Sequence, residues 1–359
     1  MTCSSPSGPY RVMLPTEQRF VLAASRVNCD ARTVAEIKAL LQEPFDWPSV
    51  LQLAIPHGTL PLITRNLRHI APDRIPESLL WQLTHYAEGI RIRNEKARGE
   101  LVRVIAGMRR RHIDPVPFRG PVLETSIYRE PGLREYADMD LMVRREEVAS
   151  AIEAIEAVGY RLSSRQQQRG LALCLRQGDA LEFVQEGAVT IDLHWCFSNK
   201  SFDFRLDSES LRRDVESVEM GGLRVSVYDP RSTLAILCGH QAKHRWRRLN
   251  WLCDIAALVD TCGRMDWSSA LKTARDAGGE RIVLTTLELT RILLGVTLPD
   301  EVALRLRQDL RVGLLAQRLA PGILTSNVAG RMLYLQMREG NPIMVASRYL
   351  MAKLRHRLA

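Results

Sequence analysis

The sequence predicts an α+β fold, in which a small mixed sheet is flanked by helical domains at both ends of the chain. Two observations predict it. Before residue 112 and after residue 230, apolar residues recur every three to four positions, which is the spacing of one helix face. Between these limits, short segments alternate apolar and polar residues, as strands do. We therefore expect a flexible N-terminus at 1–14, a helical domain at 15–112, an α/β domain at 113–229 and a helical domain at 230–359.

Proline and glycine mark the ends of the expected helices. Pro76 suits the first turn of the longest one, which continues to about Arg111, because a proline there lacks only an N–H that would be unpaired anyway. Pro121 opens a shorter helix that runs through Tyr128, and an amphipathic helix at 145–158 ends before a glycine. The helices expected after residue 230 cover 231–244, 247–260, 266–277, 279–294, 299–320 and 341–355.

Strands are expected where apolar and polar residues alternate over short segments. A hairpin turn at Glu186-Gly187 joins two of them. The expected strands cover 138–143, 160–162, 180–184, 188–195 and 223–228.

The composition indicates a globular protein with an anionic partner. The hydrophobic fraction is 46%, the charged fraction is 25% and the formal net charge is +9, which favours a nucleotide, a phosphorylated substrate or nucleic acid. No apolar run approaches the roughly 20 residues of a membrane helix, and the N-terminus lacks the apolar centre of a signal peptide. The seven cysteines form no Cys-x-x-Cys pair, which favours free thiols. We therefore expect a cytoplasmic protein without membrane contact.

The most informative segment is Asp138-Met139-Asp140. Residues two apart on a strand face the same side, so the two carboxylates repel each other unless a cation lies between them. Mg²⁺ is the natural cation, because it is hard and prefers oxygen ligands; Mn²⁺ is the alternative. The competing interpretation is a strand end with two solvated aspartates, since Asp-x-Asp is common.

A third carboxylate strengthens the metal interpretation. Asp192 is an acid in an otherwise apolar alternation, on the same side of its strand as His194. We expect a neighbouring antiparallel strand to bring Asp192 beside Asp138 and Asp140. Three carboxylates around metal ions form a phosphoryl-transfer site. For His194 we expect a structural hydrogen bond, with a catalytic role as the alternative.

An ordered series of short motifs runs through the chain from about residue 20 to about residue 300. The motifs are Phe118–Leu123, Tyr128, Pro131–Arg134, Asp138–Val143, Gly159–Arg161, Ile191–Trp195 and Cys238–Trp246. In this order they resemble the uncharacterised nucleotidyltransferase family within the DNA polymerase beta-like superfamily. The resemblance implies a nucleotidyltransferase-type sheet, with Asp138 and Asp140 as metal ligands and Asp192 as the third acid. It also implies that Lys243 contacts the nucleotide phosphates.

Arg119-Gly120 stands where the family usually has Lys-Gly, and the Gly-Ser turn of the broader superfamily is missing. Arg119 can still pair with a phosphate, and does so bidentately. Gly120 would let the backbone approach a phosphate at a helix start, or is an ordinary turn glycine. Arg134 either holds the triphosphate or pairs with Glu130 or Glu135.

Three residues of one expected helix, His240, Lys243 and His244, share a face. His-x-x-x-His resembles half of a zinc site, but the glutamate of His-Glu-x-x-His is replaced by Gln241. We therefore favour a phosphate contact from Lys243, assisted by His244. Dinucleotide-binding, P-loop and Gly-x-Ser-x-Gly motifs are missing.

The sequence thus predicts an Mg²⁺-dependent transferase that moves a nucleotidyl group from an NTP such as ATP to a hydroxyl or phosphate. The acceptor would be a small molecule, a peptide or a protein in a biosynthetic pathway. One alternative is a nucleotide-binding partner module of the same fold with impaired catalysis. A second is a nucleic-acid-modifying transferase, against which stands the absence of a basic stripe interleaved with aromatic residues.

Overall fold

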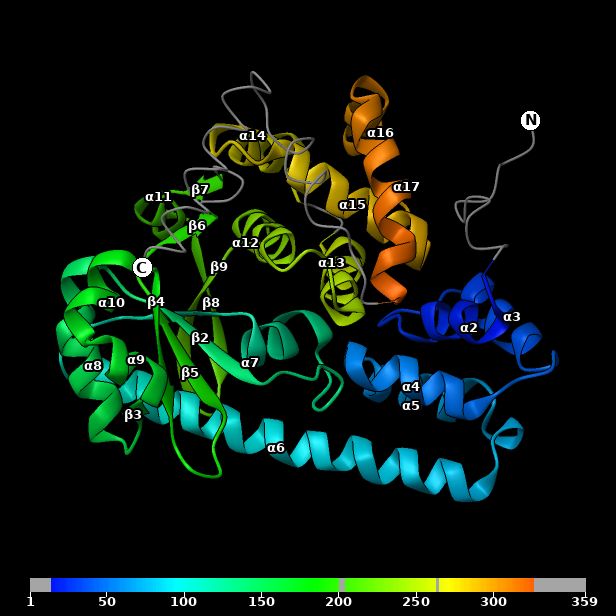
Figure 1. Ribbon diagram of the computed structural model, residues 1–359, viewed down its shortest axis with the longest axis horizontal. Helices are drawn as coiled ribbons and strands as arrows, with labels where there is room; N and C mark the ends of the chain where they lie inside the picture. The colour runs from blue at the N-terminus through cyan, green and yellow to red at the C-terminus, as the bar shows by residue number, and fades with distance from the viewer. Residues whose placement is uncertain (1–13, 200–203, 263–264, 326–359) are drawn as a thin grey trace. The chain divides into compact units, whose positions relative to one another are not determined.

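The computed structural model describes residues 14–199, 204–262 and 265–325 (Figure 1). The helix expected at 341–355 and residues 1–13 of the expected flexible N-terminus lie outside these ranges. Two compact units make up the chain. The sheet unit comprises Gly58–Phe197 and Asp207–Asp229, and the helical unit comprises Met1–His57, Ser198–Leu206 and Pro230–Ala359.

The sheet unit is built around a five-stranded mixed sheet with the order β1-β2-β5-β4-β3. Its strands are β1 (Val116–Phe118), β2 (Asp138–Met142), β3 (Arg161–Leu162), β4 (Ala180–Val184) and β5 (Thr190–His194). The central strands β2 and β5 are parallel, whereas the β1–β2, β4–β5 and β3–β4 pairs are antiparallel. The β4–β5 pair is the hairpin that Glu186-Gly187 predicts. The α+β fold with a small mixed sheet is confirmed.

Helices cover one face of this sheet. Apolar residues of β2, β4 and β5 form one buried core with the long helix α6 (Glu77–Arg109), with α8 (Val148–Ala157) and with residues of β9. In Figure 1, α6 is the long cyan helix that passes beneath the strands. The other elements of this unit are α5 (Leu60–Ile70), η1 (Pro72–Arg74), α7 (Gly120–Leu123), η2 (Glu124–Tyr128), η3 (Arg145–Glu147), α9 (Ser164–Arg169), α10 (Leu171–Gln177), α11 (Ser208–Arg213), β8 (Val215–Met220) and β9 (Leu223–Tyr228).

Several of these short elements were missed by the sequence patterns. The helices α9, α10 and α11 have six or seven residues each, which is too short to display a helical period. Strand β8 pairs with β9 in antiparallel orientation, but three of its six residues are acidic or serine and two of these are adjacent, so its alternation is weak.

The helical unit consists of helices from both ends of the chain. They are α2 (Thr16–Ala24), α3 (Ala31–Leu40), α4 (Trp47–His57), α12 (Pro230–Lys243), α13 (Leu249–Thr261), α14 (Trp267–Asp276), α15 (Glu280–Leu294), α16 (Asp300–Gln308) and α17 (Leu310–Leu324). The short strands β6 (Phe197–Asn199) and β7 (Phe204–Leu206) pair with each other. The single helix expected at 299–320 is wrong, because Asp309 ends α16 and caps α17 by accepting a hydrogen bond from the Arg311 N–H at 3.1 Å.

Within the described ranges, we find no helix with both the length and the apolar character that crossing a bilayer requires.

Candidate metal and nucleotide site

Two neighbouring strands bring Asp140 and Asp192 together. On β2, Met139 and Leu141 are fully buried in the core, so Asp138 and Asp140 face the opposite side of the sheet. Strand β5 lies beside β2 with Asp192 in register with Asp140. The expectation of an antiparallel neighbour is wrong, because β2 and β5 are parallel. The carboxylates still meet, since residues in register on adjacent strands point to the same face.

Asp140 has no exposed side-chain surface, and two cationic or imidazole groups contact it. Its Oδ1 accepts hydrogen bonds from Nη2 of Arg119 and from Nε2 of His194, the latter at 3.0 Å. Its Oδ2 is also buried but has no hydrogen-bond partner in the part of the chain that the structure describes. A buried carboxylate oxygen without a donor is costly, so this atom is a candidate metal ligand.

The surroundings give the three acids different pKa values. Burial, and then the negative charge of Asp140, raise the pKa of Asp192 to about 6. The same two causes raise the pKa of Asp138, although Arg119 and Arg134 partly oppose them. Burial also acts to raise the pKa of Asp140, but the Arg119 charge and the His194 hydrogen bond outweigh it and lower that pKa. Asp140 is therefore the most readily ionised of the three.

The donor atoms fit a divalent cation. One ligand atom each from Asp140, Asp192 and His194 lie within 4.8 Å of one another. Two carboxylates suit Mg²⁺ or Mn²⁺, and the imidazole shifts the preference toward Mn²⁺. Asp138 shares the face and feels the charge of Asp140, but it is not part of this group of three. The metal roles predicted for Asp138, Asp140 and Asp192 stay predictions.

Arg119 reaches the acids from the junction between β1 and α7. Its backbone has φ 60° and ψ −156°, a region that is populated almost only by glycine. Gly120 follows with φ 42°, and a Cβ there would lie 3.0 Å from the carbonyl oxygen of Asp138. The helix predicted from Pro121 through Tyr128 is present as one α-helical turn, α7, that continues into the π-helical turn η2.

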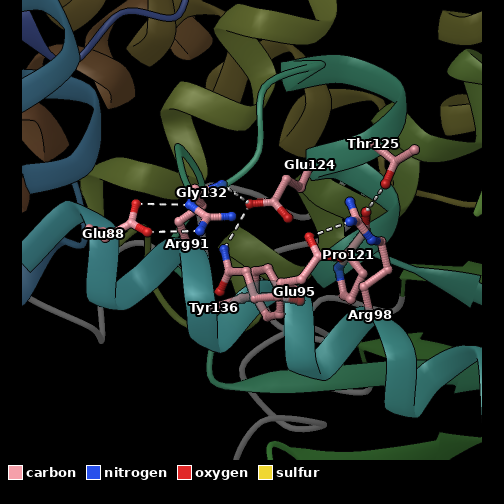
Figure 2. A network of polar contacts seen from close by, with 10 residues as sticks. Glu88, Arg91, Glu95, Arg98, Pro121, Glu124, Thr125, Gly132 and Tyr136 are labelled. Atoms are coloured by element: carbon pink, nitrogen blue, oxygen red, sulfur yellow. Dashed lines mark hydrogen bonds and ion pairs between the residues drawn. The ribbon is translucent and has the colours of Figure 1, made fainter. Parts of the chain in front are cut away.

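A loop between η2 and β2 places Arg134 near the acids. Asn94 of α6 donates from Nδ2 to the carbonyl oxygen of Arg134 at 2.8 Å and to Oε1 of Glu124 at 2.7 Å. The same Glu124 oxygen accepts from the N–H of Gly132 at 2.7 Å, a contact that Figure 2 shows. Arg134 is itself buried, and its charge acts to lower the pKa of Asp138. The α6 helix thus fixes the loop, and the loop fixes Arg134.

The loop approaches α6 very closely. A Cβ added to Gly132 would lie 2.6 Å from Cβ of Arg91, and Gly132 has φ +84°, so only glycine fits here. In the sheet unit, α5, α6 and the outer side of this loop also line a cavity of about 500 Å³. The three acids are not among the residues that line this cavity.

A comparison with protein families identifies the family of this chain. A family described as uncharacterised nucleotidyltransferase matches residues 43–295. The chain belongs to this nucleotidyltransferase family. The match includes every site residue described above. Neither the curated proteins nor the solved structures yielded a match.

Lys243 and His244 belong to the helical unit, where Lys243 is the last residue of α12 and His244 follows in a turn. Lys243 is exposed, and the His244 ring packs against His240 at 4.6 Å and Trp251 at 5.5 Å between ring centroids. The nucleotide contacts that the resemblance to the nucleotidyltransferase family implies for these two residues stay predictions. Among the described residues, the only group of three or more possible metal-ligating side chains is the acid cluster, so a zinc site at His240 and His244 gains no support.

The structural hydrogen bond expected for His194 is present, because its Nε2 lies 3.0 Å from Oδ1 of Asp140, and the imidazole also belongs to the group of three possible ligands. One further residue near the acids was missed as a candidate. Glu182 of β4 lies in register with Asp192. The sequence signal for Glu182 is its position between Leu181 and Phe183, which are both buried. Because side chains alternate along a strand, Glu182 faces the same side of the sheet as the acids.

Proposed function

We propose that this member of the nucleotidyltransferase family is a metal-dependent enzyme that transfers a nucleotidyl group from an NTP. The acceptor would be a hydroxyl or phosphate of a small molecule, a peptide or a protein. The observation that carries the proposal is the pairing of Asp140 with Asp192 across two parallel strands, next to a buried oxygen of Asp140 that has no donor in the described chain.

The chain's own residues supply binding and orientation. Asp140 and Asp192, with His194 and the nearby Asp138, would hold Mg²⁺ or Mn²⁺. When bound, such an ion would offset the negative charge that develops on the phosphate in the transition state. Arg119 and Arg134 supply positive charge from β1 and from the loop, where a triphosphate would need it. A carboxylate that stays ionised near the ion would accept the proton of the attacking hydroxyl.

The test is release of pyrophosphate from a panel of NTPs with Mg²⁺ or Mn²⁺, together with transfer of an α-phosphate label. Asp140→Asn should reduce turnover about 10³-fold or more, equivalent to roughly 4 kcal/mol of transition-state stabilisation. Asp114→Asn is a matched control, because Asp114 is a half-exposed carboxylate outside the site that pairs with Arg109. Turnover by Asp140→Asn at the wild-type rate would end the proposal.

One observation favours a second function, a nucleotide-binding partner module with impaired catalysis. Arg119 already pairs with the central carboxylate, where the family usually has lysine. Calorimetry that detects NTP binding, without turnover for any acceptor or metal, would support this alternative. Turnover that depends on Asp140 would exclude it.

A further inference from the structure

The ion pair between Arg119 and Asp140 lies inside the metal site of the proposed function. Both groups are buried, with side-chain exposures of 10% and 0%. A guanidinium stays protonated in proteins. Arg119 is therefore a permanent cation in contact with the carboxylate at which a metal ion would bind.

We infer that Arg119 is an internal counter-cation that holds Asp140 in the metal-free protein and must leave Asp140 when a divalent ion binds. The inference rests on the proposed function, since it concerns the same acids. It assigns Arg119 a second role beyond a phosphate contact: it sets how tightly the free protein binds metal.

The charges on the sheet face that carries the acids support this displacement of Arg119 by a metal ion. Three carboxylates (Asp138, Asp140 and Asp192) lie on this face of the sheet. The guanidinium of Arg119 contacts Asp140, and the charge of Arg134 acts on Asp138. Without metal the group is close to neutral, so the acids remain together at modest cost. A divalent ion beside Asp140 would make the group net positive, and a guanidinium in contact with the same carboxylate would repel the ion. Departure of Arg119 removes this repulsion.

The hydrogen bonds to Asp140 also support the inference that Arg119 leaves when an ion binds. Arg119 and His194 both contact Oδ1, whereas an ion shared by Asp140, Asp192 and His194 needs the lone pair of an imidazole nitrogen. His194 cannot donate to Asp140 and ligate an ion through the same nitrogen, so metal binding through Nε2 would change the hydrogen bonds at Oδ1. Oδ2, which has no donor among the described residues, is the acceptor that an ion would fill.

The backbone conformation of Arg119 indicates that contacts with neighbouring residues hold this residue in place. A non-glycine residue at φ 60° and ψ −156° is strained. Such strain persists only where neighbouring contacts over-determine it, and the ion pair with Asp140 is one of these contacts. When the pair breaks, the side chain is available for the triphosphate of an incoming nucleotide, which carries the complementary charge.

The experiment measures Mn²⁺ binding to the full-length protein without nucleotide, by the loss of the free-ion signal in electron paramagnetic resonance. Arg119→Met should bind Mn²⁺ at least tenfold more tightly than the wild type. Arg119→Gln, which keeps hydrogen-bond donors but loses the charge, should behave in the same way and serves if the Met variant does not fold. Arg119→Lys, which keeps the charge, should stay near the wild type.

A second readout separates this role from a purely structural one. In metal-free buffer, Arg119→Met should melt below the wild type, because three carboxylates lose a cation, and Mn²⁺ should raise its melting temperature by more than that of the wild type. The same variant should bind NTP with Mg²⁺ more weakly. Arg109→Met is the matched control: its ion pair with Asp114 lies in the same unit but outside the site, and its Mn²⁺ affinity should equal that of the wild type.

The experiment distinguishes failure of the counter-cation role from failure of the proposed metal site. If the wild type binds Mn²⁺ in a way that Asp140→Asn abolishes, while Arg119→Met and Arg119→Gln bind no more tightly, the counter-cation role is wrong and the proposed function stands. If neither the wild type nor the Arg119 variants bind Mn²⁺, the metal site and the counter-cation role are both wrong.

Discussion

Two buried carboxylate groups in this protein have opposite surroundings. In the helical unit, Glu280 accepts from Arg275 at 2.8 and 2.9 Å and from Arg305 at 2.8 and 3.0 Å, so both of its oxygens have donors. Burial acts to raise its pKa, but these hydrogen bonds outweigh it and lower the pKa. In the sheet unit, Asp140 has one oxygen with two donors and one with none among the described residues, beside a carboxyl of Asp192 whose pKa rises to about 6.

This difference separates a carboxylate that stabilises the fold from one that is available to bind a ligand. A buried carboxylate with all its acceptor sites filled contributes to the fold and has no capacity left for a ligand. A carboxylate with a buried oxygen that lacks a donor, beside two further acids, is unfavourable in the fold by itself. Such an arrangement is typical of functional sites, which is why we propose Asp140, and not Glu280, as a metal ligand.

The largest expected effect is the difference in stability loss between a substitution at Glu280 and one at Asp140. Glu280→Gln should lower the free energy of unfolding by about 1 to 3 kcal/mol, because two partly exposed arginines lose the charge of the buried carboxylate that they share, and it should leave Mn²⁺ binding unchanged. Asp140→Asn should lower the free energy of unfolding by less than Glu280→Gln does, since Asp138 and Asp192 remain near Arg119 and carboxylate repulsion falls. Urea denaturation in metal-free buffer measures both values, and equal losses would contradict the comparison.

A smaller effect should appear in the pH dependence of stability. The pKa of Asp192 is raised from 3.8 to about 6, so between these values the folded protein holds more protons than the unfolded chain. Its contribution to stability is full below pH 3.8 and is lost as pH rises through 6. The loss should be on the order of 2 kcal/mol, and Asp192→Asn should remove it. Denaturation curves of both proteins from pH 4 to 7.5 test this, and identical slopes would refute it.

The smallest expected effect isolates the backbone strain at Arg119. Arg119→Ala and Arg119→Gly both remove the guanidinium, so their difference reports the conformation at φ 60° and ψ −156°. The glycine variant should be more stable by about 1 kcal/mol, because glycine adopts this region without strain. At Arg161 in strand β3 the order should reverse, with alanine more stable than glycine. Thermal melting measures both pairs, and alanine as the better residue at 119 would contradict the strain.

The sequence was sufficient for features that depend on local periodicity. The alternation around Asp138 and Asp140 predicted a strand with both acids on one face, and the core positions of Met139 and Leu141 confirm that side-chain pattern. The glycine at 187 predicted the β4–β5 hairpin. The long helix α6 and the presence of a small sheet between helical segments followed from the same rules, because the periods of helices and strands are fixed by backbone geometry.

Only the tertiary structure decided which residues meet. It made β2 and β5 parallel rather than antiparallel, and it brought His194 and Arg119 to the same oxygen of Asp140. Strand order and side-chain pairing depend on the packing of segments that lie far apart in the chain, and periodicity within one segment does not encode them. The sequence by itself thus determined that acids face one side of a small sheet, whereas the fold determined that a cation of the chain itself already lies among them.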